Sequence, residues 1–290
     1  MLLLSCSSKL QLLEGALRQA LPETLPVLGA VMNICRGNPA GHEVLVDSWP
    51  NFKAVLTRPR KEVATDNSDF YANMHAAFYR DLDAYRALLS SPGAINWAQT
   101  FRIHGLQDSV YEASREIAGA KGFQVYPSTY LVYLLPSSSA IPDVRLDPAM
   151  RLSNLDVSHV DLLNKTWYYG GNEWSRRYID MLIRSFPSIC FLDAAGHPIS
   201  WNITDPFGAM SIGYTLPEHR GCGYSSALCF ILAQKIQAQG YPIYGNVALD
   251  NHPMQRLQQW LGFQRQTNLC RIILHSPVPG NLPAWVLPDF

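Results

Sequence analysis

The sequence lacks the charge imbalance that marks several classes of protein. Acidic and basic residues number 23 each, so the formal net charge is zero, and no long run of like charge is present. Charged residues make up only 16% of the chain, below the roughly 25% of average soluble domains. A nucleic-acid-binding protein normally carries a basic surface that neutralises phosphates. We therefore expect no nucleic-acid partner.

Long apolar segments are also missing. Runs such as residues 227–233 fall well short of the about 18 apolar residues that a membrane-spanning helix needs. The apolar start at residues 1–4 is shorter than the core of a signal peptide, which takes about 7–15 residues. An Arg-rich mitochondrial presequence is not visible, because Glu14 stands near Arg18 in a segment with a helical pattern. We expect no membrane span and no secretion.

The cysteines form neither a metal-binding nor a disulfide pattern. Six cysteines are scattered along the chain without a C-x-x-C pair, and the eight histidines are not clustered. A structural zinc site needs four converging ligands, usually with close spacing in one half of the site. We expect no metal site, and free thiols in a reducing compartment.

The chain is long enough for two domains. It has 290 residues, of which 48% are apolar. A Pro- and Ser-rich segment at 136–148 predicts a linker between an N-terminal half, 1–135, and a C-terminal half, 149–290. In the first half the patterns predict helices at 10–21, 82–89 and 109–120, and strands at 27–34, 44–46, 54–57 and 130–135.

The second half has the more regular pattern of elements. Its order is helix, helix, three strands, helix, strand, helix and a final hairpin. The predicted ranges are 157–167, 174–186, 189–192, 198–202, 210–216, 226–239, 244–249, 253–261, 264–266 and 269–274. Because a helix between strands favours right-handed crossovers, we expect an α/β fold with a mixed, mainly antiparallel sheet and helices on both faces.

A glycine loop lies between the strand at 210–216 and the following helix. It reads EHRGCGYS (residues 218–225). The backbone N–H groups of such a loop and of the first helical turn form an anion site, to which Arg220 adds a cation. The loop is neither a Walker loop nor a complete G-x-G-x-x-G fingerprint, since Ser226 stands at the third glycine position. Taken alone, it predicts either a diphosphate site or an ordinary turn before a helix.

Two motifs together resemble the GNAT superfamily of acyl-CoA-dependent N-acyltransferases. The loop R-x-x-G-x-S is similar to the superfamily's [QR]-x-x-G-x-[GA] pyrophosphate loop, with Ser225 at the last position. Residues 251–263, NHPMQRLQQWLGF, are similar to its second signature, N-x-x-[AS]-x-x-x-[YL]-x-x-L-G-F. The resemblance implies that acyl-CoA is a co-substrate and that no cofactor is tightly bound. The residues that would contact it are Tyr214, Leu216, Arg220, Gly221, Cys222, Gly223, Tyr224, Ser225 and Asn251.

A narrower resemblance, over about residues 1–275, is to the glycine N-acyltransferase family and its paralogues. It is carried by NICRGNP (33–39), DSWPNF (47–52), GGNE (170–173), SFPS (185–188) and GYTLPEHR (213–220). The family implies tandem GNAT-like domains, of which the first is degenerate and lacks the CoA loop and the second is catalytic. It also implies acyl-CoA and glycine as small-molecule substrates and a mitochondrial location, with a cytoplasmic one as the alternative. We further expect a monomer.

Glu218 is the candidate general base. It stands at the end of a predicted strand, two residues before the loop's arginine, and the resemblance implies this role for the glutamate of the L-P-E segment. The alternatives are a solvated charge or an ion pair with Arg220. His219 is a rival base, although neighbours on an extended strand point to opposite faces. Cys222 is disfavoured as a nucleophile because no His–acid pair accompanies it.

Other site assignments are weaker. The strand backbone over residues 214–216, with Tyr214 and Leu216 as the named contacts, is expected to bind the pantetheine amides, and one of its N–H groups to polarise the thioester carbonyl. Asn251 either contacts the cofactor or caps its helix. Asn172 and Arg177 are expected to hold the glycine carboxylate, with an ordinary helix cap as the alternative. The tyrosine that protonates the leaving thiolate in many GNAT enzymes is missing, because we expect its place at Leu257 or Trp260.

These observations leave three functions open and disfavour a fourth, a protein acetyltransferase, because no acidic groove for basic tails is evident. The first is acyl-CoA:glycine N-acyltransfer by direct attack in a ternary complex. The second is transfer to glutamine or another amino acid. The third, suggested by the missing tyrosine and by Ser225, is a catalytically silent CoA-binding or interaction protein.

Overall fold

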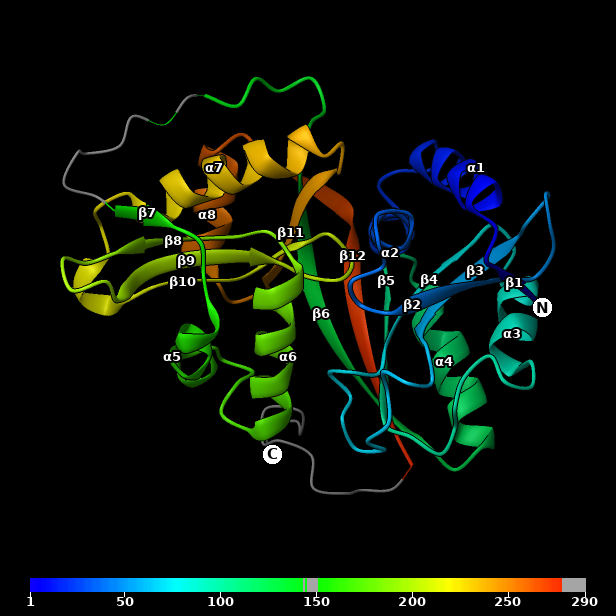
Figure 1. Ribbon diagram of the computed structural model, residues 1–290. Helices are drawn as coiled ribbons and strands as arrows, with labels where there is room; N and C mark the ends of the chain where they lie inside the picture. The colour runs from blue at the N-terminus through cyan, green and yellow to red at the C-terminus, as the bar shows by residue number, and fades with distance from the viewer. Residues whose placement is uncertain (143, 145–150, 278–290) are drawn as a thin grey trace. The chain divides into compact units, whose positions relative to one another are not determined.

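The computed structural model describes residues 1–142, 144 and 151–277 of the chain (Figure 1). These residues form two compact units, one made of residues 1–131 and the chain from residue 267 onward, the other of residues 132–266. The predicted linker, 136–148, lies partly outside the described residues. Strand β6, Gln124–Leu135, contributes residues to both units.

The first unit is built on a sheet with the order β1-β2-β3-β4-β5-β12. Its neighbours are antiparallel, except for the parallel pair β4–β5. The strands are β1 Leu2–Leu4, β2 His42–Val46, β3 Ala54–Pro59, β4 Met74–Tyr79, β5 Phe101–Gly105 and β12 Gln264–Ser276. The helices are α1 Ser7–Arg18, α2 Leu25–Cys35, α3 Leu82–Ser90 and α4 Ser109–Ala120.

Helices cover both faces of this sheet. One core cluster joins α3 and α4 to side chains such as Leu56 and Ile103. Helix α2 is not part of that cluster although it also packs against β2, β3 and β4, so it covers the other face. The strand predicted at 27–34 is therefore wrong, since these residues belong to α2. Every residue from Leu25 to Met32 is buried, and a helix that is apolar on all sides has no period of 3.6 to distinguish it from a buried strand.

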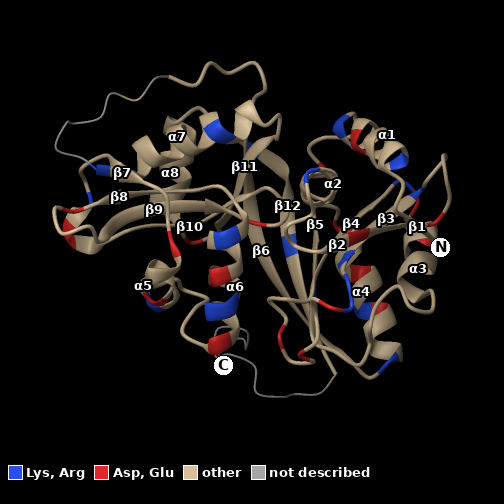
Figure 2. Cartoon of the chain, viewed as in Figure 1, with Lys and Arg blue, Asp and Glu red and all other residues tan. Residues whose placement is uncertain are grey.

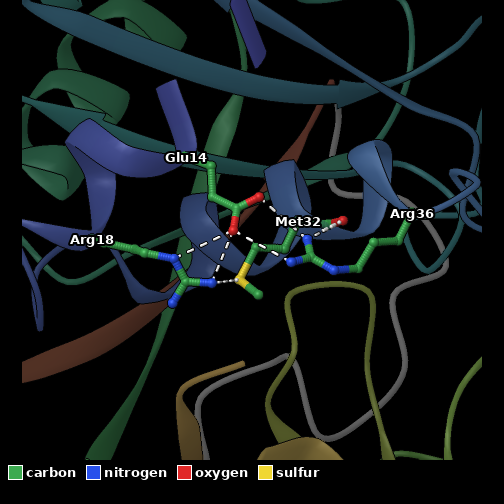
Figure 3. A network of polar contacts seen from close by, with 4 residues as sticks. All are labelled: Glu14, Arg18, Met32 and Arg36. Carbon is green, nitrogen blue, oxygen red and sulfur yellow. Dashed lines mark hydrogen bonds and ion pairs between the residues drawn. The ribbon is translucent and has the colours of Figure 1, made fainter. Parts of the chain in front are cut away.

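Helix α1 is tied to the end of α2 by one carboxylate (Figure 3). Glu14 accepts hydrogen bonds from Arg18 at 2.8 Å and from Arg36 at 3.2 Å. Arg36 also donates to the Met32 carbonyl at 3.0 Å. Burial alone would raise the pKa of Glu14, but the hydrogen bonds from Arg36 and Arg18 outweigh it and lower the pKa below its ordinary value. Arg36, the arginine of the motif at residues 33–39, thus has a structural role in this unit.

The second unit has the sheet order β7-β8-β9-β10-β11, antiparallel except for the parallel pair β10–β11. Its strands are β7 Arg151–Ser153, β8 Ser188–Leu192, β9 Pro198–Thr204, β10 Met210–Thr215 and β11 Ile243–Ala248. Its helices are η1 Val157–His159, α5 Val160–Thr166, α6 Glu173–Ser185, η2 Pro217–His219, α7 Tyr224–Ala238 and α8 His252–Trp260. The predicted mixed α/β class is confirmed.

Charged residues of both signs alternate along α6 (Figure 2). Arg184 pairs with Asp180 at 2.8 Å, and Arg176 pairs with Asp161 of α5 at 2.7 Å. An alternating pattern of this kind offers no continuous basic stripe on the helix.

The end of the chain differs from the expected hairpin. Residues 264–276 form one continuous strand, β12, whose residues Arg271–His275 pair with β5 in the first unit. Sequence analysis assigned these residues to the second half. A pairing across more than 160 positions leaves no local signal in a pattern of neighbouring residues.

Candidate functional site

Strand β10 is irregular where it leads into the glycine loop. Its register with β9 shifts between Ser211 and Tyr214, and Ile212 has a φ of 51°. Its parallel pairing with β11 joins Met210 to Gly245. Within the described second unit, the β11-facing edge of the rest of β10 therefore has no ladder partner. Such an edge offers backbone N–H and C=O groups to a ligand that carries amides.

The register decides which residues of β10 present their backbone to this edge. Leu216 donates its N–H to the Ile199 carbonyl of β9 at 2.9 Å, so this N–H does not face the open edge. Backbone groups alternate along an antiparallel pair, so those of Thr215 point away from β9. In agreement, the Thr215 carbonyl accepts a hydrogen bond from Arg220 Nε at 3.1 Å. Thr215 lies within the predicted segment 214–216, but the sequence did not single it out, because which residue faces the edge depends on the bulge in β10.

Glu218 lies on a short 3₁₀ helix instead of an extended strand. Strand β10 ends at Thr215, and η2 spans Pro217–His219. Pro217 at the start favours this turn, since its φ suits the first helical position. With about three residues per turn, Glu218 and His219 differ by about 120° in direction. The expectation that they point to opposite faces of a strand is therefore wrong.

The Glu218 side chain is exposed, and no described residue forms a hydrogen bond or an ion pair with it. Arg220 is engaged elsewhere, because its guanidinium bonds the Thr215 carbonyl and lies 5.2 Å from the centre of the Tyr214 ring. The predicted alternative, an ion pair between Glu218 and Arg220, is not formed. His219 is half-buried, with its ring 6.5 Å from that of Tyr224.

The loop that follows needs its two glycines for conformation. Gly221 and Gly223 have φ values of 79° and 80°, in the left-handed region that side chains disfavour. A Cβ atom at either position would meet no described atom within 4 Å, so backbone conformation, not crowding, requires glycine. Cys222 is exposed, and its thiol lies 3.7 Å from the Arg220 carbonyl oxygen.

Helix α7 begins directly after this loop. Gly223 is its N-cap residue, and no side chain caps the first turn. The first backbone N–H groups of a helix have no partner within the helix. Tyr224 and Ser225 therefore present N–H donors beside the loop and beside Arg220, as an anion site requires.

Asn251 caps helix α8. Its side-chain oxygen accepts the Met254 N–H at 3.2 Å, which is one of the two roles left open by the sequence. Counted from Asn251 to the L-G-F end, the tyrosine position of the signature falls on Gln258, so placing it at Leu257 or Trp260 is wrong. Gln258 is buried, and its amide is 4.0 Å from the Cys229 sulfur. A carboxamide is not a proton donor for a thiolate.

Asn172 caps helix α6. Its side chain accepts the Ser175 N–H at 2.8 Å, and the Ser175 hydroxyl accepts the Asn172 N–H at 3.2 Å. Asn164 of α5 reinforces the cap by accepting from Ser175 Oγ at 2.7 Å. Asn172 therefore acts as a helix cap, the alternative role that the sequence predicted. Binding of the glycine carboxylate by Asn172 and by the exposed Arg177 stays a prediction.

The described part of the chain contains neither a metal-binding cluster nor a membrane-spanning helix. No group of three or more His, Cys, Asp or Glu side chains there is arranged to hold a metal ion. None of the helices in that part is both long and apolar enough to cross a bilayer.

Comparison with known proteins identifies the family. The family profiles of aralkyl acyl-CoA:amino acid N-acyltransferases match residues 1–187, and those of its C-terminal region match residues 189–269. The chain is 34% identical to a glycine N-acyltransferase of Bos taurus over 303 aligned residues, which cover 98% of each chain.

Solved structures show the same fold. A Drosophila protein superposes with a TM-score of 0.76 at 15% identity, covering 95% of this chain and 98% of its own. A tandem GNAT protein from the clavulanic acid biosynthesis pathway gives a TM-score of 0.51 at 13% identity, covering 94% and 95%. The expected GNAT fold is therefore confirmed, and the chain belongs to the family of aralkyl acyl-CoA:amino acid N-acyltransferases.

Proposed function

We propose that this protein is an acyl-CoA:glycine N-acyltransferase that transfers the acyl group by direct attack in a ternary complex. The observation that carries the proposal is the succession of Glu218, Arg220 and the uncapped first turn of α7 within eight residues of one loop. A carboxylate with no partner among the described residues thus stands beside an anion site. Glycine as the acceptor is supported by the name of the bovine relative.

The anion site suits the diphosphate of CoA. Arg220 provides a cation, and the N–H groups of Tyr224 and Ser225 provide donors at the positive end of a 15-residue helix. Gly221, Cys222 and Gly223 expose their backbone on the same loop. The open edge of β10 would pair with the pantetheine amides, and the Thr215 N–H would polarise the thioester carbonyl.

Glu218 is proposed to accept a proton from the ammonium group of glycine. The free amine then attacks the thioester carbonyl carbon, the C–N bond forms and the C–S bond breaks. The nitrogen loses its second proton to solvent as the amide forms, and the leaving CoA thiolate takes up a proton from the protonated Glu218 or from solvent. The exposure of Glu218 gives the carboxyl group access to both amine and water.

A thiol-release assay tests this function. Acyl-CoAs with aromatic and aliphatic chains are combined with glycine, with glutamine and with no acceptor. Glycine-dependent release of CoA is expected. Release with another amino acid but not glycine would favour a different acceptor. Tight binding of CoA without turnover in any combination would show a catalytically silent CoA-binding protein and would contradict the proposal.

The remaining assignments follow from the same family. A mitochondrial location and a monomeric state stay predictions, to be tested by imaging the tagged protein in cells and by light scattering.

A further inference from the structure

Thr215 connects three elements around the glycine loop. It is the last residue of β10 and is buried, with 8% exposure. Its hydroxyl oxygen lies 2.7 Å from Ser200 Oγ on β9 and 2.8 Å from Ser225 Oγ in the first turn of α7. The same residue receives Arg220 Nε on its carbonyl at 3.1 Å.

The protons in this hydroxyl chain can be assigned by counting. Ser200 Oγ also lies 3.2 Å from the Tyr214 carbonyl oxygen, which can only accept. Ser200 has a single hydroxyl hydrogen and donates it there, so Thr215 must donate to Ser200. Ser225 must then donate to Thr215. All three contacts are satisfied only when the chain runs from Ser225 through Thr215 and Ser200 to the Tyr214 carbonyl.

This direction matters for the loop. The hydroxyl hydrogen of Ser225 points inward to Thr215, so the side chain has no hydrogen left for an anion outside. Ser225 can therefore serve a phosphate through its backbone N–H but not through its hydroxyl. Its side chain instead fastens the first turn of α7 to the end of β10.

We propose that Thr215 is a positioning residue for CoA binding, which holds the N–H groups of the first α7 turn in place through the hydroxyl of Ser225. The inference rests on the proposed function, because the anion is taken to be the CoA diphosphate. The Thr215 carbonyl fixes Arg220 at the same time, so both parts of the anion site depend on one residue.

The test is a double-mutant cycle on CoA binding, measured by calorimetry with CoA itself. Thr215→Val and Ser225→Ala are each expected to weaken binding about threefold to tenfold, the worth of one hydrogen bond. Since both remove the same contact, the double variant should bind no more weakly than the weaker-binding single variant. Thr215→Ser retains the hydroxyl and should restore most of the affinity.

Thr204→Val is the matched control. Thr204 is a buried threonine of β9 whose hydroxyl bonds the Pro187 carbonyl at 3.3 Å, away from the loop. It should lose thermal stability as Thr215→Val does while keeping CoA affinity. In steady-state assays, Thr215→Val should raise the KM for acyl-CoA, and Thr215→Ser should bring the KM back towards the wild-type value.

The outcomes separate the two proposals. Absence of CoA binding by the wild-type protein would overturn the proposed function and this role with it. Wild-type binding together with effects that multiply in the double variant, or with a Thr215→Val variant of unchanged affinity, would overturn the role of Thr215 alone.

Discussion

Acid should destabilise the first unit through its buried histidines, and His275 allows this to be measured. Its ring is fully buried on β12, stacked on Phe101 at 4.3 Å, and its Nδ1 is 3.0 Å from the Ile273 carbonyl. Burial lowers the pKa of His275 from 6.5 to about 3, although hydrogen bonds with the backbone of Ile273 and of Phe101 oppose this shift.

The size of the effect follows from that pKa. The unfolded chain binds a proton at His275 below about pH 6.5, whereas the folded chain stays neutral down to about pH 3. Stability is therefore fully present above pH 6.5 and is lost as the pH falls, by about 1.4 kcal/mol per pH unit. At pH 5 the loss from His275 alone is about 2 kcal/mol, a sizeable part of the total of roughly 5–15 kcal/mol for a typical protein.

Urea unfolding at pH 7 and pH 5 tests this reasoning in wild type and His275→Phe. Phenylalanine fills the aromatic site but does not titrate, so the variant should lose about 2 kcal/mol less than wild type between the two pH values. Any packing cost of the substitution is the same at pH 7 and at pH 5, so it cancels when the two free energies of unfolding are subtracted. His197→Phe, at an exposed histidine, is the control for replacing a histidine by phenylalanine. Equal pH dependence of His275→Phe and wild type would refute the reasoning.

Three further results are expected. Arg220→Ala should weaken CoA binding by calorimetry about tenfold to a hundredfold, because a charge-assisted hydrogen bond is typically worth about 1.5–3 kcal/mol; unchanged affinity would remove Arg220 from the site. Initial-rate kinetics should give intersecting lines, since acyl-CoA and glycine react in one ternary complex; parallel lines or a trapped acyl-Cys222 would contradict direct attack. Asn172→Ala should lower the free energy of unfolding by about 1 kcal/mol, the usual contribution of an N-cap. If the same variant also binds glycine more weakly, Asn172 contacts the acceptor as well.

Local patterns predicted the second unit well. The predicted bounds of helix α6 and of strands β8 and β9 lie within two residues of the observed bounds. These segments have a clear hydrophobic pattern, and turn residues such as Asp193 and Gly196 mark where the strands end. The first unit was harder. Strands β4 and β5 were missed, since β4 reads MHAAFY with five consecutive buried residues and has no alternation.

In the candidate site, too, the features set by local sequence could be predicted and those set by distant contacts could not. Gly221, Gly223 and Arg220 could be found from the sequence because a tight loop before a helix restricts residue types locally. The hydroxyl contacts of Thr215 could not be predicted, since they join it to residues 15 positions before it and 10 after it. The motifs at 33–39 and 170–173, which also carried the resemblance to the family, have structural roles in turns and helix caps. Asn38 holds the start of β2 through two 2.8 Å hydrogen bonds to His42, and Asn172 caps α6, so both motifs encode turns.

The central claim, that Glu218 is the general base, is tested most directly by the rate of Glu218→Gln relative to wild type across about pH 6.5–9.5. Glutamine keeps the size and polarity of the side chain but cannot take the ammonium proton. General-base assistance typically contributes about 10²–10⁴-fold, so a loss in that range is expected near pH 7, with CoA affinity unchanged. The exposed Glu62→Gln is the control for loss of one carboxylate.

As the pH rises, more glycine arrives already deprotonated, so the account predicts that the deficit of Glu218→Gln narrows towards pH 9.5. A ratio that stays flat over the whole range, together with weakened CoA binding, would contradict it and would show that Glu218 stabilises the loop instead.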